Sequence, residues 1–351
     1  MKIFHVITKS SLGGAQSVVV NLANNQVQKN EVFVISSAGG EAWNALDKRV
    51  KVISIKELNR EISLLDVIVF LKLVFYRFRY NPHVVHLHSS KIGILGRIAF
   101  SPFKTIYTIH GFDSIRVANR KFLFLERILK YWCRFIVGVS KYDYDNLCAE
   151  HITRNVTTIY NGVMDYSKQT TFIHSLRSLI LEKRKNFKHI VMSVARDDAP
   201  KLPDLFAEIA KYNPEYYFVW IGNGKKRTDT FNLHWAGMIS EAYLLMQDAD
   251  LFLLPSGFEG LPMCILEAFS FSKPVVASNV GGIPELLNGE NGIAVKNSVE
   301  EFSKAIHHFL DSQTVYDTAC KAARKTYELD LQDCVMVNRY MELYRKIYKG
   351  K

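Results

Sequence analysis

Residues 254–267 read LPSGFEGLPMCILE and continue an apolar run, ADLFLLPS at residues 249–256. The apolar run predicts a buried strand, and Gly257 and Gly260 predict a tight loop directly after it. Pro262 fits the first turn of a helix, where its missing N–H group costs no hydrogen bond. The stretch therefore predicts a strand, a loop and a helix in succession, which is the repeating unit of an α/β fold.

The same alternation extends in both directions along the chain. Further apolar runs that predict strands lie at residues 2–8, 32–37, 50–55, 83–89, 105–110, 135–140, 156–162, 189–195, 216–222, 233–237, 273–278 and 292–295. Helical patterns separate most of these runs, for example at residues 61–80, 119–134 and 299–311. Strands that alternate with helices predict parallel sheets covered by helices on both faces, with ligand sites beyond the carboxyl ends of the strands.

The length predicts two such sheets. At about 100–200 residues per domain, a chain of 351 residues is expected to form two domains. We expect them at residues 1–165 and 166–330, followed by a helix at residues 331–351 with a basic and aromatic pattern. The polar stretch 166–186 is the candidate linker, and two Rossmann-like halves that face each other leave a cleft for a small ligand.

Composition and charge exclude several classes of protein. Five cysteines without a CxxC pair predict reduced thiols, and the most apolar segment, residues 62–80, carries four charged side chains and so is not expected to span a membrane. Residues 1–165 hold 22 Lys and Arg against 12 Asp and Glu, and they carry nearly all of the net charge of +11. This excess predicts an anionic partner, such as phosphate, a membrane surface or nucleic acid; the alternative is a bias that only aids solubility.

Two acidic residues in the opening stretch suit a nucleotide ligand. Glu259 lies in the loop and Glu267 more than one turn inside the helix. The start of a helix attracts a diphosphate, and a carboxylate one or two turns further on can accept the hydroxyls of a ribose. For either residue alone, a favourable interaction with the helix dipole is the simpler explanation.

The spacing of Glu259 and Glu267 within this motif resembles the retaining glycosyltransferases of family 4, which have the GT-B fold. Other elements resemble that family in the same order: Gly13-Gly14-Ala15, His110-Gly111, Ser140, Tyr160-Asn161-Gly162-Val163, Ala195-Arg196 with Lys201, Ile221-Gly222-Asn223-Gly224 and Gly281-Gly282-Ile283-Pro284-Glu285. Ala195 stands where the family usually has glycine. The resemblance implies an α/β chain of two Rossmann-like domains across a cleft, with a C-terminal helix that crosses back to the first domain.

The chemistry of a sugar-nucleotide donor gives these residues roles. Breaking the anomeric C–O bond builds negative charge on the diphosphate, and Arg196 and Lys201 suit that charge; a solvated loop paired with Asp197 and Asp198 is the alternative. The resemblance implies that Glu259 contacts a sugar hydroxyl or the anomeric region and that Glu267 contacts the ribose. It also implies that His110 contacts the donor sugar or acts near the reacting centre. The remaining expected donor contacts are Gly13, Gly14, Gly222, Gly237, Met238, Gly260, Leu261, Pro262 and Met263.

No metal or cofactor is expected. Asp248-Ala249-Asp250 is an Asp-x-Asp sequence, but its place between a helix and a strand explains it as helix-end polarity. His86 and His88 are expected to be structural, and no cluster of metal ligands is expected around them. Arg196 and Lys201 would replace a metal, and the resemblance implies retention through front-face attack.

The acceptor is expected in the basic first half. Residues 116–134 predict a basic amphipathic helix with aromatic side chains, which suits a membrane surface; an ordinary helix packed on the sheet is the alternative. The resemblance favours a UDP-sugar, a lipid-pyrophosphate-linked glycan and bacterial polysaccharide assembly, on the inner face of the cytoplasmic membrane. Two alternatives from other classes remain open. One is a nucleic-acid-binding module, suggested by the basic charge; no helix-turn-helix, zinc-finger or RNP-like string supports it, and nucleic acid is not an expected partner. The other is a sugar-nucleotide epimerase, or a non-catalytic sugar-nucleotide binder, of the same fold.

Overall fold

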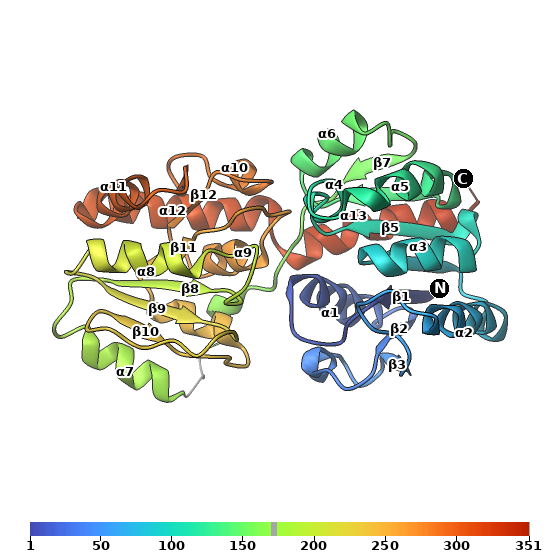
Figure 1. Ribbon diagram of the computed structural model, residues 1–351, viewed down its shortest axis with the longest axis horizontal. Coiled ribbons are helices and arrows are strands. Elements are labelled where there is room, and N and C mark those ends of the chain that lie inside the picture. Colours follow the sequence, from blue (N-terminus) through green and yellow to red (C-terminus); the bar gives the residue numbers. More distant parts are fainter. Residues whose placement is uncertain (170–173, 351) are drawn as a thin grey trace. The chain divides into compact units, whose positions relative to one another are not determined.

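The computed structural model describes residues 1–169 and 174–350. The chain forms two compact units, here called unit 1, with residues 1–162 and 333–351, and unit 2, with residues 163–332 (Figure 1). The predicted α/β class is confirmed, because each unit is one parallel sheet with helices around it. The last helix, α13 (Asp333–Tyr348), returns to unit 1 and packs against α1 (Gly14–Gln26).

The sheet of unit 1 has seven parallel strands in the order β3-β2-β1-β4-β5-β6-β7. The strands are β1 (Lys2–Ile7), β2 (Glu31–Ser37), β3 (Lys51–Ile55), β4 (Val84–His88), β5 (Thr105–Ile109), β6 (Phe135–Gly138) and β7 (Val156–Thr158). The helices are α1, η1 (Glu41–Ala45), α2 (Leu65–Tyr80), α3 (Ser90–Ala99), η2 (Pro102–Lys104), α4 (Asp113–Arg116), η3 (Arg120–Phe122), α5 (Leu123–Leu129), η4 (Lys130–Trp132), α6 (Lys141–Ala149) and α13. The strand order reverses between β1 and β4, which is where ligands of such sheets bind.

Two glycines bring α3 close to this sheet. A Cβ atom on Gly93 would lie 2.5 Å from the ring of Tyr107, and one on Gly96 would lie 2.5 Å from a methyl group of Leu87. Leu87 and Tyr107 are buried in β4 and β5, in the main apolar core of the unit. The contact between helix and sheet therefore depends on the missing side chains.

The sheet of unit 2 has six parallel strands in the order β10-β9-β8-β11-β12-β13. The strands are β8 (Ile190–Val194), β9 (Tyr217–Ile221), β10 (Leu233–Trp235), β11 (Leu251–Leu254), β12 (Val275–Ser278) and β13 (Gly292–Val295). The helices are η5 (Tyr166–Lys168), α7 (Ser175–Lys183), α8 (Pro203–Tyr212), η6 (Ala242–Asp248), α9 (Met263–Ser270), α10 (Ile283–Leu286), α11 (Val299–Leu310) and α12 (Gln313–Asp330). Here the order reverses between β8 and β11, so the stretch 254–267 leaves the sheet at its switch point.

Two sequence predictions differ from the structure. The candidate linker 166–186 contains α7, whose Leu176 and Ile180 are buried in unit 2; residues 170–173 of it lie outside the described residues. The helix predicted at 119–134 is an unbroken helical run over residues 120–132, in which only α5 is α-helical and the flanking η3 and η4 are 3-10 helices.

Candidate active site

The loops after four strands of unit 2 pack backbone against backbone at the switch point. A Cβ atom on Gly222, after β9, would lie 1.8 Å from the carbonyl oxygen of Ala195, after β8. Gly281, after β12, has a φ of +57°, and a Cβ atom on it would lie 1.8 Å from the carbonyl oxygen of Glu259. Only glycine allows these approaches, so the glycines of the predicted motifs hold the loops of the site together.

Lys201 and Glu259 form an ion pair at the centre of these loops, between Lys201 Nζ and Glu259 Oε1. The side chains are 13% and 12% exposed. The hydroxyl of Ser256 donates to the same carboxylate oxygen over 2.7 Å. A backbone bridge between Lys201 and Ser256 joins the two loops, so the pair is held from both sides.

The charge of Lys201 is stabilised although the side chain is buried. Burial lowers its pKa, but the neighbouring carboxylate of Glu259 outweighs this effect, and the pKa stays above its usual value. A buried ammonium group with one carboxylate partner keeps further N–H donors for a ligand anion. The structure thus brings together two of the residues that the sequence analysis assigned to the donor site.

Arg196 does not join this pair. Its side chain is 51% exposed, and Nη1 lies 3.3 Å from Asp198 Oδ2, as the alternative explanation from the sequence expected. Asp197 instead accepts two hydrogen bonds from Arg227, at 2.7 and 2.8 Å. Arg227 was missed by the sequence analysis; the basic run Lys225-Lys226-Arg227 after the loop at Gly224 was the available signal.

Glu267 lies in α9 and is only 9% exposed. Burial raises its pKa to about 7. In the described part of the chain, its carboxyl group accepts no hydrogen bond and has no ion-pair partner, unlike that of Glu259. A buried carboxyl group that lacks partners is costly to ionise, and hydroxyl donors from a ligand would supply the missing partners.

The start of α9 lies between these two acidic residues. Pro262 is its N-cap residue and makes no side-chain capping hydrogen bond. Leu261 and Met263 are buried, and Gly260 accepts a hydrogen bond at its carbonyl oxygen from Gly282 N over 3.0 Å. The positive end of the helix dipole is thus fixed next to the pair of Lys201 and Glu259.

Two of the expected donor contacts, Gly237 and Met238, lie close to the loop after β9. The Gly237 carbonyl oxygen accepts a hydrogen bond of 2.8 Å from Gly222 N, and Gly237 has a φ of +69°. Met238 is 55% exposed. This segment therefore adjoins the site on the side of β9 and β10.

The expected glycine loop of unit 1 lies at the start of α1. Gly13 is the N-cap residue and Gly14 the first residue of the helix. A Cβ atom on Gly13 would meet only the end of the flexible Gln16 side chain. The packing of unit 1 therefore does not require glycine here, which leaves close approach by a ligand as a reason for it.

His110 follows β5 and is partly exposed at the carboxyl edge of the unit 1 sheet. Its Nε2 lies 3.1 Å from Nδ1 of His88, and the two rings are stacked. Burial lowers the pKa of His110 to about 4, so its imidazole is neutral at pH 7.

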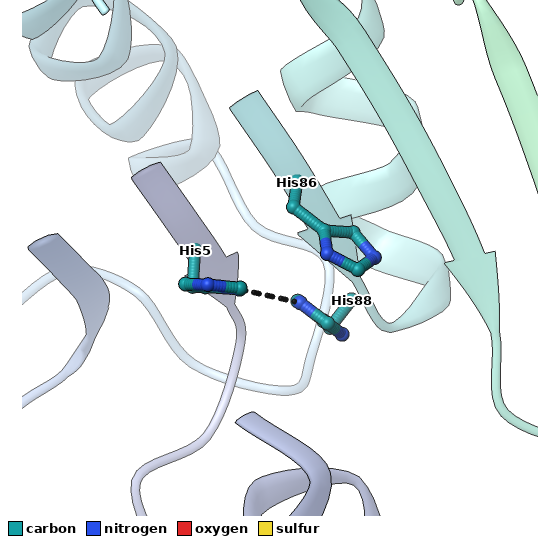
Figure 2. A group of neighbouring side chains, drawn as sticks. All are labelled: His5, His86 and His88. Atoms are coloured by element: carbon teal, nitrogen blue, oxygen red, sulfur yellow. Dashed lines mark hydrogen bonds between the residues drawn. The ribbon is translucent and has the colours of Figure 1, made fainter. Parts of the chain in front are cut away.

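His88 belongs to a buried group of three histidine side chains, His5, His86 and His88 (Figure 2). One nitrogen from each ring lies within 4.8 Å of the others, close enough to share a metal ion. The expectation that no such cluster would form was wrong, because the pairing of β1 with β4 sets His5 beside His86. Each of the three rings is already hydrogen bonded at both nitrogens or stacked against its neighbours, so the group also satisfies itself without a metal.

Asp248 and Asp250 form ion pairs. Arg177 Nε lies 3.1 Å from Asp248, and Arg184 Nη1 lies 3.0 Å from Asp250. Both carboxylates therefore fasten α7 and the segment after it to the sheet, in agreement with the structural explanation given to this sequence.

Known proteins resemble the chain over nearly its whole length. Residues 12–165 match the model for Glycosyltransferase Family 4, and residues 167–312 match the model for Glycosyl transferases group 1. The O-antigen biosynthesis glycosyltransferase WbnH of Escherichia coli is 27% identical over 98% of both chains. The UDP-Gal:alpha-D-GlcNAc-diphosphoundecaprenol alpha-1,3-galactosyltransferase of E. coli is 29% identical over 90% of this chain and 89% of its own.

Solved structures agree on the fold. HepE from Anabaena, crystallised in complex with UDP and glucose, superposes with a TM-score of 0.81 at 18% identity and covers 98% of this chain and 99% of its own. The chain thus has two parallel-sheet units, with switch points at β1/β4 and β8/β11, and each unit matches one glycosyltransferase domain model. The chain therefore belongs to the family 4 glycosyltransferases and has the GT-B fold.

Proposed function

We propose that the protein transfers a sugar, with retention of configuration and without a metal, from a UDP-sugar to a hydroxyl group of a lipid-diphosphate-linked glycan. The observation that carries the donor half of this proposal is the arrangement at the switch point of unit 2. There the paired Lys201 and Glu259 adjoin the start of α9, and the buried Glu267 carboxyl group lacks a partner among the described residues.

Each group has a chemical task in this proposal. The two ribose hydroxyls donate to the Glu267 carboxylate, while the start of α9 and Lys201 face the diphosphate. Lys201 stabilises the charge that grows on the diphosphate as the anomeric C–O bond breaks, and Arg196 adds a second cation from the same loop. Glu259 holds Lys201 in place and accepts a hydrogen bond from a sugar hydroxyl.

The transfer is balanced without a further reagent. The bond between the anomeric carbon and the diphosphate oxygen breaks, and a new bond forms from the acceptor hydroxyl oxygen to the same face of that carbon. The hydroxyl proton passes to the leaving diphosphate. Retention on this route needs no protein nucleophile, and the sequence offers no convincing one.

The acceptor half of the proposal comes from the relatives. The printed name of the galactosyltransferase relative specifies a UDP-sugar donor and a diphosphoundecaprenol-linked acceptor, and that of WbnH specifies O-antigen biosynthesis. Both match this chain along most of its length. A role in surface polysaccharide assembly, at the cytoplasmic side of the membrane, follows as the proposal for this chain.

An apolar stripe on unit 1 supports action at a membrane surface. Within and just before α2, eight large apolar side chains are exposed: Ile62, Leu64, Leu65, Val67, Ile68, Leu71, Phe75 and Phe78. Phe78 is 74% exposed, and basic Arg77 and Arg79 lie along the same helix, while Lys72 pairs with Glu57 at 2.5 Å. Apolar residues on one helical stripe with cations beside them suit an anionic bilayer.

The segment 116–134, which the sequence predicts to bind a membrane, has two of its cations in ion pairs. Arg116 pairs with Asp113 at 2.7 Å, and Arg127, although 43% exposed, pairs with Glu150 at 2.5 Å. Its exposed apolar residues are Val117, Phe124, Ile128, Tyr131 and Trp132. Since α3 contacts both α2 and α5, the three helices form one layer, and the proposed membrane face spans this layer.

Across residues 1–169 and 174–350, no helix is both long and apolar enough to cross a membrane. The exposed apolar side chains of α2 and α5 are what support the proposed attachment at the membrane surface.

Thermal stabilisation by UDP-, GDP- and dTDP-sugars tests the donor half. We expect a rise in Tm with UDP-sugars that is lost in Glu267→Ala and kept in Glu208→Ala, an exposed glutamate on α8. Product analysis with a lipid-diphosphate-linked acceptor then tests transfer. Conversion of the donor without any acceptor would indicate an epimerase, and binding without any product would indicate a non-catalytic binder; either result contradicts the proposal.

A further inference from the structure

A row of hydrogen bonds runs through the interior of unit 1 and ends at His110. Gln26 Oε1, at the end of α1, lies 2.8 Å from Nε2 of His5. His5 Nδ1 lies 3.1 Å from Nε2 of His88, and His88 Nδ1 lies 3.1 Å from Nε2 of His110. The row joins α1, β1, β4 and the end of β5, and its first three members are at most 2% exposed.

The protons in this row must all point the same way. Burial lowers the pKa of His5 and of His110 to about 4 and that of His88 well below its usual range, so all three rings are neutral at pH 7. A neutral imidazole has one N–H donor and one acceptor nitrogen. The group at the start of the row therefore sets the tautomer of every ring after it.

The third buried histidine, His86, lies outside this row. The Tyr344 hydroxyl of α13 lies 2.5 Å from its Nδ1, and the Thr108 hydroxyl lies 2.7 Å from its Nε2. Both nitrogens of His86 are thus occupied by partners outside the row.

The Gln26 amide turns its carbonyl oxygen, not its nitrogen, toward His5. A carbonyl oxygen can only accept a hydrogen bond, so Nε2 of His5 must carry the proton. The amide nitrogen is buried and has no hydrogen-bond partner among the described residues.

We propose that Gln26 is a positioning residue: it holds His5, His88 and His110 in the Nε2–H tautomer and so presents Nδ1 of His110 as a hydrogen-bond acceptor. In the described part of unit 1, no group is hydrogen bonded to this nitrogen. Its ligand is a hydroxyl donor, which under the proposed function is a hydroxyl of the donor sugar. A residue without contact to the ligand thus fixes which hydrogen bond the site offers.

The tautomers can be read directly by nuclear magnetic resonance on the full chain with ¹⁵N-labelled histidine, at pH 7 and without any substrate. We expect a proton on Nε2 and none on Nδ1 for His5, His88 and His110, with resonances assigned from single His→Gln variants. A proton on Nδ1 of His110 would overturn the proposal. So would stoichiometric binding of added Zn²⁺ with loss of these N–H signals, since the rings would then serve as metal ligands.

Variants at Gln26 test the consequence for activity. Gln26→Met removes the acceptor at similar volume and is expected to mix the His110 tautomers and lower kcat/KM about fivefold, the factor that one hydrogen bond of about 1 kcal/mol gives. Gln26→Glu keeps an acceptor oxygen toward His5 and is expected to retain the wild-type His110 tautomer. Gln28→Met, at an exposed position just after α1, is the matched control.

Two results would count against the role of Gln26. Transfer at the wild-type rate by a Gln26→Met protein whose His110 tautomers are mixed would show that the tautomer does not matter to the reaction. Wild-type tautomers throughout the Gln26→Met protein would show that another group sets them. Failure of the proposed function is separate, because it appears as a lack of donor binding and leaves the substrate-free spectra of the wild type unchanged.

Discussion

Replacing Glu267 by glutamine should stabilise the protein without ligand and weaken its binding of the donor. The carboxyl group is buried and has no side-chain partner among the described residues, and burial raises its pKa from 4.5 to about 7. Because the folded-state value lies above the unfolded value, the folded protein binds more protons between these two pH values. Its stability therefore falls as the pH rises through that window.

The shift gives the size of the effect. At 1.36 kcal/mol per pKa unit, a rise from 4.5 to about 7 corresponds to a cost of about 3 kcal/mol once the group is ionised in both states. At pH 8 this whole cost is present, and at pH 5 it is about 1 kcal/mol or less, since the buried carboxyl is then protonated. Glu267→Gln is neutral at every pH and avoids the cost.

Urea unfolding at pH 5 and pH 8 measures this difference, with tryptophan fluorescence as the signal. We expect the free energy of unfolding of Glu267→Gln to be higher than that of the wild type, and this difference to be about 2–3 kcal/mol larger at pH 8 than at pH 5. Glu208→Gln, at an exposed position on α8, is the control and should show no such change. Addition of UDP-sugar should reverse the order at pH 8, because only the carboxylate accepts both ribose hydroxyls.

A stability difference between Glu267→Gln and the wild type that stays the same from pH 5 to pH 8 would refute the reasoning about burial. Equal stabilisation of both proteins by UDP-sugar would refute the assignment of Glu267 to the ribose. The two results are independent, since the first is measured without ligand.

Three further perturbations follow from the structure. Lys201→Ala should lower kcat by a factor of about 10²–10³, the usual loss when one stabilising donor to a developing anion is removed. Lys201→Arg keeps a cation beside Glu259 and should lose less activity. Initial rates with a UDP-sugar measure both effects, and equal rates for the two variants would count against this role. Arg97→Met should destabilise unit 1 by about 3–5 kcal/mol in urea unfolding, because it leaves Glu126 buried without the partner that lies 2.7 Å away. Restored stability in Arg97→Met/Glu126→Leu would support this reason, and an unchanged stability of the single variant would contradict it. Phe75→Ser/Phe78→Ser should weaken binding to anionic vesicles at least tenfold by removing two large exposed apolar side chains, while Phe231→Ser, at an exposed site of unit 2, should bind as the wild type; sedimentation with vesicles measures both, and equal binding would remove α2 from the membrane face.

Local pattern was enough to predict the strands and the acidic motif. The apolar runs at β1, β4, β5 and β8 to β13 each lie between glycine-rich or polar loops. The hydrophobic pattern and these flanking loops were therefore enough to locate the strands without tertiary information. Glu259 and Lys201 were predicted from motif spacing, and the structure pairs them. The type of helix was less predictable, as at residues 119–134, where 3-10 helices flank the α-helix α5.

What spacing could not provide is the choice of partner for a charged or polar side chain. Arg196 and Lys201 stand on one loop, yet only Lys201 is buried against Glu259, while Asp197 binds Arg227 from the loop after β9. Likewise, the apolar stripe of α2 follows a plain helical pattern, and its exposure becomes evident only once the sheet and α3 have covered the other side of the helix.

The order of residues along the chain was thus sufficient for the class of fold, because this depends on periodicity and on glycine and proline at given positions. The roles given to the acidic motif came from its resemblance to a known family. Only the tertiary structure set His5 beside His86 and His88, Gln26 beside His5, and Tyr344 beside His86. The physical reason is strand order: β1 pairs with β4, about 80 residues away in sequence, and α13 returns to the same unit. Hydrogen bonds between such distant elements have no local sequence signal.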